Sequence, residues 1–206
     1  YCSTRSLIHI KLLGSTMIKK LILITPILFS SIVVADTNIG IGLGSQISYD
    51  SVFLTGITGR IWLNERTAIG ASYSISMSEG NENDDKTSAD TDRIAIRGIY
   101  SVLGNEISRV YAGLEYSQAN RKSKYTGSSG YSSINDADTT GLSAILGYEG
   151  FINKVKSGSF YLETGYGIYD RDTSVNFVSS SGEESESKEN EDVAGGFIGV
   201  GINFYL

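Results

Sequence analysis

The sequence predicts an all-β protein: an eight-stranded antiparallel up-and-down transmembrane β-barrel, preceded by a signal peptide. Three observations predict it: a secretory signal near the start, eight segments in which apolar residues alternate with small or polar ones, and connections that are short and long by turns. The last segment, GGFIGVGINFYL, shows the alternation clearly, because Ile198, Val200, Ile202 and Phe204 fall on one face of a strand.

The first observation concerns the N-terminal part of the chain. Met17 begins a short basic segment, an apolar run follows it, and Ala35 precedes an expected cleavage site before Asp36. The apolar run is too short for a membrane anchor, and its flanks are those of a secretory signal. We therefore expect an upstream, non-native segment at residues 1–16, a signal peptide at residues 17–35 and an outer-membrane β-barrel domain at residues 36–206.

Cleavage at that site changes the chemistry that the chain can offer. The single His9, Cys2 and Pro26 are lost, as are four of the 17 basic residues, whereas all 23 acidic residues remain. The mature chain is therefore more acidic than the formal net charge of −6. An acidic exported chain argues against nucleic-acid binding, which needs clustered basic residues. Without cysteine it has no disulfide framework.

The second observation is the set of alternating segments. Each one matches the two-residue period of a strand only weakly, but eight in succession without a helical period are strong evidence for a β-barrel. The segments are residues 39–49, 53–63, 69–77, 93–102, 109–116, 141–149, 160–168 and 195–206.

The third observation is the length of the connections. Those at residues 64–67, 104–107 and 150–158 are short, and those at residues 78–91, 119–137 and 170–192 are long and polar. This is typical of short periplasmic turns and long extracellular loops. The first hairpin, near Asp50 and Ser51, departs from the pattern because it is very short.

The composition of the two faces predicts which solvent each one meets. One face is almost entirely aliphatic and aromatic, with rings near the strand ends, whereas the other is rich in Gly, Ser and Thr. Small residues suit a narrow lumen, so we expect the aliphatic face to meet lipid and the sheet to close, because no water satisfies backbone groups in hydrocarbon. The alternative is a soluble, secreted lipocalin-like barrel with the aliphatic half inside.

Charged residues on the lumen face form one cluster with chemical character. Arg97 and Glu115 come from hairpin neighbours and are expected to lie close together. Unpaired charge in a tight interior is costly, so a salt-bridged, partly hydrated plug is predicted. It has two interpretations, interior packing of a narrow barrel or a gate, and a barrel of eight strands favours packing. The cluster comprises Arg60, Arg93, Arg97, Arg109, Glu115, Glu149 and Glu163.

The signal, the eight strands, the connections and the C-terminal strand together resemble a known family. Residues 36–206 are similar to the small eight-stranded outer-membrane β-barrels of the OmpA-like, opacity-protein and Ail/Lom types, often described as porin-family barrel domains. The resemblance implies a Gram-negative outer membrane as location after export through the inner membrane, contact with membrane lipid and lipopolysaccharide, and no cofactor. It also implies recognition by the barrel assembly machinery through Phe204 and Leu206, although the family usually ends in an aromatic residue.

The function expected from these observations is that of a non-enzymatic surface barrel, structural or adhesive, whose loops meet host or surface ligands. A small porin-like channel for ions or solutes is the alternative. An outer-membrane enzyme is disfavoured because the mature chain lacks histidine for proton transfer, and neither a catalytic residue nor a metal ligand is assigned. The expected interaction residues are Arg121, Lys122 and Lys124 in the middle long loop and Glu183, Glu184 and Glu186 in the last.

Overall fold

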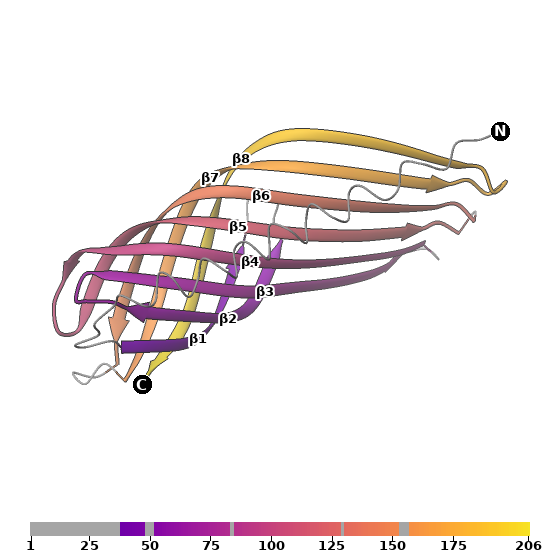
Figure 1. Ribbon diagram of the computed structural model, residues 1–206. Coiled ribbons are helices and arrows are strands. Elements are labelled where there is room, and N and C mark those ends of the chain that lie inside the picture. The colour runs from indigo at the N-terminus through magenta and orange to yellow at the C-terminus, as the bar shows by residue number, and fades with distance from the viewer. Residues whose placement is uncertain (1–37, 48–51, 83–84, 129, 153–156) are drawn as a thin grey trace. The chain divides into compact units, whose positions relative to one another are not determined.

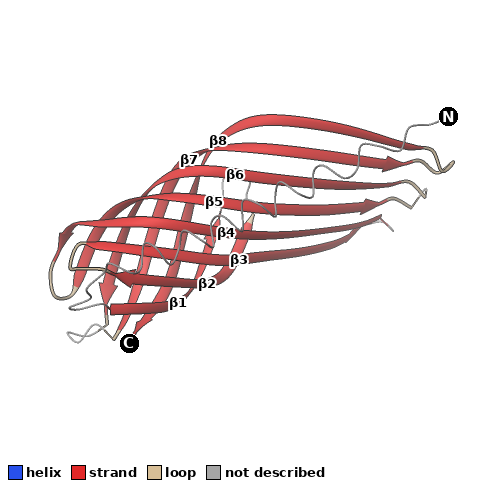
Figure 2. Ribbon diagram, in the orientation of Figure 1, coloured by secondary structure: helices blue, strands red, loops and turns tan. Residues whose placement is uncertain are grey.

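The computed structural model describes residues 38–47, 52–82, 85–128, 130–152 and 157–206, and in them eight strands follow one another along the chain (Figures 1 and 2). Each strand pairs antiparallel with the next, and β8 pairs with β1, so the sheet closes into a barrel. This confirms the predicted fold class. The strands are β1 Asn38–Ile47, β2 Phe53–Trp62, β3 Thr67–Glu82, β4 Asp85–Gly104, β5 Ser108–Thr126, β6 Ser132–Phe151, β7 Gly158–Val178 and β8 Glu184–Tyr205.

Three sequence predictions concern residues that the structure does not describe. The upstream segment at residues 1–16, the signal peptide at residues 17–35 and the first hairpin near Asp50 lie outside the described residues. In the part of the chain that is described, no helix is long and apolar enough to cross a membrane.

Two of the short connections at one end of the barrel are closed by asparagine side chains. Asn64 Oδ1 accepts hydrogen bonds from the backbone N–H groups of Arg66 at 2.9 Å and Thr67 at 2.8 Å. Asn105 Oδ1 does the same for Ile107 at 2.9 Å and Ser108 at 2.8 Å. An Asx side chain that replaces a backbone acceptor stabilises a tight turn. We call this the short-turn end.

The prediction of three long loops at the opposite end is wrong, because strands occupy most of these segments. Strands β3 to β8 have 16 to 22 residues each, and they run through most of these segments as paired ribbons (Figure 1). Opposed polar side chains explain the pairing: Lys122 lies 3.5 Å from its cross-strand partner Asp136, and Asn190 donates to Asp172 at 2.6 Å across β7 and β8. Cross-strand pairs of this kind stabilise a sheet that is wet on both faces.

Strands β1 and β2 are only 10 residues long, and they do not follow the others into this region. The pairing of β1 with β8 ends at Ile47 and Ile198, and that of β2 with β3 ends at Thr55 and Ile75. Beyond these residues β3 to β8 form an open, six-stranded sheet (Figure 1). We call this part the extended sheet, and the closed part the barrel.

The aliphatic side chains cover the outside of the barrel, as predicted. Leu43, Ile57, Leu114 and Ile198 are each between 58 and 60 % exposed, and many similar residues alternate with buried ones along every strand. A soluble barrel would bury this half, so the observation excludes a lipocalin-like arrangement. Rings also lie on this outer face, and those near strand ends are Phe53, Tyr100, Tyr148, Phe160 and Phe204. Tyr116 and Tyr166 were expected near strand ends but lie in the middle of β5 and β7, because these strands continue into the extended sheet.

The predicted inner face needs one correction, because it is less uniformly small and polar than expected. An apolar cluster lies inside the barrel beside the charges. Its members on β2, β4, β5 and β6 follow the same odd or even parity as the inward charges of those strands. The cluster comprises Trp62, Ala68, Ile99, Tyr111, Ile145 and Phe197, with Tyr205 packed against it.

Candidate functional site

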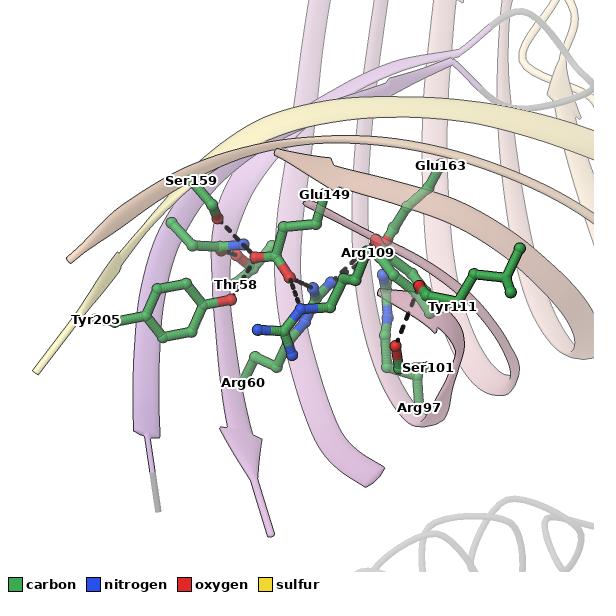
Figure 3. Close-up of polar contacts among 12 residues, drawn as sticks. Thr58, Arg60, Arg97, Ser101, Arg109, Tyr111, Glu149, Ser159, Glu163 and Tyr205 are labelled. Atoms are coloured by element: carbon green, nitrogen blue, oxygen red, sulfur yellow. Dashed lines mark hydrogen bonds and ion pairs between the residues drawn. The ribbon is translucent and has the colours of Figure 1, made fainter. Parts of the chain in front are cut away.

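The seven charged residues predicted for the lumen are all brought together inside the barrel. Figure 3 shows five of them, Arg60, Arg97, Arg109, Glu149 and Glu163. Among the described residues they are linked by six ion pairs into one unbranched series in which the sign of the charge alternates. We call this series the axial chain. Its order is Arg93, Glu115, Arg97, Glu163, Arg60, Glu149 and Arg109.

The two ion pairs of Arg97 are short, and those of Arg60 are longer. Arg97 Nη1 lies 2.5 Å from Glu163 Oε2, and Arg97 Nη2 lies 2.5 Å from Glu115 Oε2. Arg60 joins Glu163 at 3.0 Å and Glu149 at 3.3 Å. The three carboxylates are at most 3 % exposed. Each is held between two guanidinium groups, which offsets the cost of removing it from water.

The strand register explains how these side chains meet. Arg97 and Glu115 are direct partners across β4 and β5, as predicted from the hairpin. Arg60 lies between Gly40 and Gly70 on the neighbouring strands, and Glu163 lies between Gly147 and Gly199. Glycine on both sides leaves room for a long side chain to cross the lumen. The two residues therefore meet although 103 positions separate them in the chain.

Neutral groups also donate hydrogen bonds to two of the three carboxylates. Tyr111 donates its hydroxyl proton to Glu163 Oε1 at 2.5 Å, and Ser159 donates to Glu149 Oε1 at 2.6 Å. The hydroxyl of Tyr205 also donates to Glu149 (Figure 3). Hydrogen bonds to a charged acceptor are stronger than neutral ones, so these donors fix the glutamate rotamers.

Both ends of the axial chain are arginines that lie over aromatic rings. At the short-turn end the guanidinium carbon of Arg109 is 3.8 Å from the ring centre of Trp62 and 4.5 Å from that of Phe151. At the other end Arg93 lies 5.9 Å from the ring centre of Phe197. Four arginines face three glutamates, and the ring faces stabilise the excess positive charge by cation–π attraction.

Little space remains in the lumen around the middle of the axial chain. The hollow that Gly44, Arg97, Tyr161 and Glu163 border measures about 30 Å³. A cavity of this size holds roughly one or two water molecules. The arrangement is therefore that of a packed interior.

The structure places Phe204 and Leu206, the residues expected to be read during assembly, at the end of β8. Phe204 is 55 % exposed on the outer face, opposite Gly158 and Ile41. Leu206 is 88 % exposed, and its backbone N–H donates to Ile39 O at 3.0 Å. The C-terminus is thus joined to β1 by the backbone, with both side chains left outside.

The six expected interaction residues do not form one patch. Arg121, Lys122 and Lys124 lie on β5, whereas Glu184 and Glu186 lie on β8, three strands away. Glu183 precedes β8, and its N–H donates to Ser179 Oγ at 3.0 Å. Because successive side chains of a strand point to opposite faces, Arg121 faces the concave side of the extended sheet while Lys122 and Lys124 face outward.

Sequence reasoning missed a pocket where the extended sheet leaves the barrel. This hollow of about 280 Å³, which we call the mouth pocket, is bordered by the ends of β1 and β2 and by inward residues of β4 to β7. The two-residue alternation could have found it, because the residues on the same face as Arg93, Glu115 and Tyr169 continue along each strand beyond the barrel and line this hollow. Its lining includes Gln46, Leu54, Thr91, Arg93, Ala119, Arg121, Asn135, Ala137, Thr139, Tyr169 and Arg171.

The chain was compared with known proteins. No protein-family model matches it, and neither does any curated protein sequence. Solved structures do match. A major outer membrane protein from Thermus thermophilus superposes with a TM-score of 0.61 at 8 % identity, over 83 % of this chain and 100 % of that one. OprG from Pseudomonas aeruginosa gives a TM-score of 0.61 at 16 % identity, over 84 % and 96 %.

A third match is Ail, the attachment invasion locus protein of Yersinia pestis, with a TM-score of 0.50 at 13 % identity over 82 % of this chain and 97 % of Ail. These structural neighbours are bacterial outer-membrane proteins. The chain has the fold of the small eight-stranded outer-membrane β-barrels. For this outer-membrane barrel fold, the exposed aliphatic half of each strand is the lipid-facing half, as the sequence predicted.

Proposed function

We propose that the chain is a non-enzymatic protein of the bacterial outer membrane that presents the extended sheet outside the cell as an interaction surface. One observation carries the proposal: a belt of exposed aliphatic side chains surrounds an ion-paired interior, and a sheet that is polar on its outward face continues beyond that belt. The belt matches the apolar band of a membrane barrel, and the polar sheet matches water on its far side. Lipopolysaccharide and the barrel assembly machinery are the partners that this location implies.

The outward face of the extended sheet sets the character of its partners. Asp92, Asp138 and Asp172 lie in one row across the strands, and acidic residues outnumber lysines on this face. Ail has been solved with the heparin analogue sucrose octasulfate. A polyanion of that kind would meet repulsion on the outward face here, so the partner we propose for it is cationic or is bridged by cations.

Surface labelling of intact cells tests the location. Lys122 and Lys188 are 66 % and 71 % exposed on the extended sheet. An impermeant amine reagent should modify both before the envelope is ruptured, and the protein should fractionate with the outer membrane. Labelling that needs rupture of the outer membrane would contradict the proposal.

The axial chain also bears on the alternative of a small channel. A lumen with room for roughly one or two waters beside Arg97 and Glu163 favours interior packing over conduction. We therefore expect the refolded protein to be silent in planar bilayers. Reproducible single-channel steps that vanish when the protein is omitted would favour the channel instead. Catalysis is not part of the proposal, and turnover of phospholipid or lipid A by the purified barrel would refute that point.

A further inference from the structure

The mouth pocket differs from the rest of the interior in its charge. Three arginines border it, Arg93, Arg121 and Arg171, and none of its described lining residues is acidic. Arg93 is 6 % exposed, and its guanidinium group donates to Gln46 Oε1 at 3.0 Å and pairs with Glu115. Arg171 lies 3.4 Å from Glu191. A guanidinium carries five N–H donors, so it can hold a neighbouring carboxylate and a ligand at the same time.

The register places the three arginines around one hollow. Arg93 and Arg171 lie in the same row of the sheet, with Ala119 and Thr139 between them on β5 and β6. Arg121 lies two residues further along β5. Three long cationic side chains thus rise from a wall whose intervening positions are small. The pocket exists because alanine and threonine occupy those positions.

The remaining lining has two further properties. Leu54, Ala119, Ala137 and the ring of Tyr169 make part of it apolar. Asn135 Oδ1 is buried there and has no hydrogen-bond partner among the described residues. Buried polar atoms in native proteins are nearly always satisfied, so an acceptor without a partner in a pocket indicates a ligand or water that donates to it.

We propose that the mouth pocket is a binding site for a small organic carboxylate with a compact apolar body, of the size of benzoate or 4-hydroxybenzoate. The carboxylate lies between Arg121 and Arg171, where planar guanidinium groups match its geometry. The apolar body lies against Ala137 and Tyr169. A volume of about 280 Å³ is close to the lower end of the range for small-molecule sites, roughly 300–1,000 Å³.

The test is calorimetric titration of the full barrel in lipid nanodiscs with three probes. Benzoate carries both the charge and the apolar body, benzyl alcohol carries only the body, and inorganic phosphate carries only the charge. We expect benzoate to bind at least tenfold more tightly than either of the others. Failure of benzoate to bind, or equal affinity for benzyl alcohol or for phosphate, would overturn the proposal.

Variants locate the site. Arg121→Gln and Arg171→Gln should each weaken benzoate binding about tenfold or more, because each removes a charge-assisted hydrogen bond. Lys122→Gln is the matched control: it removes the same charge from the next residue of β5 on the opposite face, and it should change the affinity less than twofold. If Arg121→Gln and Arg171→Gln behave like Lys122→Gln, the site is not where we place it.

Filling the pocket gives an independent measurement. Ala137→Phe should abolish benzoate binding while the barrel keeps the heat-modifiable mobility on SDS gels that folded outer-membrane barrels display. Unchanged binding by a folded Ala137→Phe variant would contradict the proposal. The arginine variants lie on the wet sheet beyond the barrel, so they test the site even if the phenylalanine variant does not fold.

Discussion

Each buried glutamate of the axial chain holds two arginines, and this ratio determines what a single substitution does. Glu163 lies between Arg60 and Arg97 and is 3 % exposed. Removing its charge takes away the counter-charge that the two guanidinium groups share, in a space that admits almost no water. Arg60 then keeps only Glu149 and Arg97 keeps only Glu115. Glu163 is therefore needed to neutralise the two arginines beside it. This holds even though an apolar interior of the same volume could be equally stable.

Glu163→Gln should accordingly destabilise the barrel by about 3–5 kcal/mol, the cost of removing one member of a buried ion-paired group. The measurement is urea unfolding in lipid vesicles, followed by the fluorescence of Trp62, the single tryptophan. Glu191→Gln serves as control: Glu191 is 46 % exposed and lies 3.4 Å from Arg171, so its loss should cost about 1 kcal/mol or less. Similar midpoints for both variants would show that the axial chain adds little stability.

A second residue-scale prediction concerns pH at the tip of the extended sheet. The hydroxyl of Tyr125, 2.5 Å away, and the backbone N–H of Ser128 at 2.8 Å donate to Asp85, and they lower the pKa of that carboxyl below its usual value. A lowered folded-state pKa means that this contact stabilises the tip above the ordinary aspartate pKa of about 3.9 and is lost as pH falls through the folded value.

The Ser128 amide shift, followed by NMR against pH, should therefore have a midpoint below about 3.9. In Tyr125→Phe the midpoint should rise toward that value, because the hydroxyl that contributes most to the lowered pKa is gone. A midpoint that Tyr125→Phe leaves in place would mean that the hydroxyl does not act on Asp85.

At the scale of the strands, the sequence predicted which face each side chain lies on better than how far each strand extends. Two-residue parity correctly placed Arg97 and Glu115 inside and Leu114 outside, because a strand has no other way to separate them. It could not mark where a strand leaves the membrane, since Ser, Thr, Asp and Asn compose both loops and wet sheets. Hairpin adjacency predicted the pair of Arg97 with Glu115, whereas the meeting of Arg60 with Glu163 depends on barrel closure and stagger, which no local pattern encodes.

Inward-facing glycines lie directly opposite inward-facing aromatic rings on neighbouring strands. Tyr111 lies directly opposite Gly147, Tyr161 opposite Gly201 and Phe197 opposite Gly165. A Cβ atom at Gly147 would lie 2.3 Å from the Tyr111 ring. The rings therefore occupy the space that the missing side chains leave, and this pairing lets an eight-stranded barrel hold aromatic residues inside.

Gly147→Ala should displace the Tyr111 ring and with it the hydrogen bond to Glu163, at a cost of about 1–3 kcal/mol for overpacking. Gly98→Ala is the matched control, because Gly98 points outward on β4 and nothing lies within 4 Å of its Cβ position. That variant should remain within about 0.5 kcal/mol of the wild type. Equal unfolding midpoints in lipid would mean that the ring moves aside freely.

At the scale of the whole described domain, one continuous sheet meets two solvents. Strand β4 passes through both: it begins at Asp85 in the extended sheet and ends at Gly104 near the short-turn end. Its outward residues change from Asp90 and Asp92 to Ile94 and Ile96 between consecutive outward positions, and Tyr100 follows on the same face. This change of composition marks where water gives way to hydrocarbon, while the hydrogen-bonded pairing with β5 continues through it.

The boundary can be measured by placing the same charge at two depths on β4. Ile96 is 44 % exposed and lies midway between Asp92 and Tyr100, at the centre of the proposed membrane span. Ile96→Arg should cost about 2–4 kcal/mol, the penalty for a cation at mid-depth on the lipid face. Ser88→Arg places the charge on the same face of the same strand, beyond Asp90, and should cost less than about 0.5 kcal/mol because water bathes that segment. Folding into vesicles of defined lipid, with urea midpoints for both variants, gives the two values. Equal costs would mean that both positions meet the same solvent, and the lipid-facing assignment of the aliphatic belt would then be wrong.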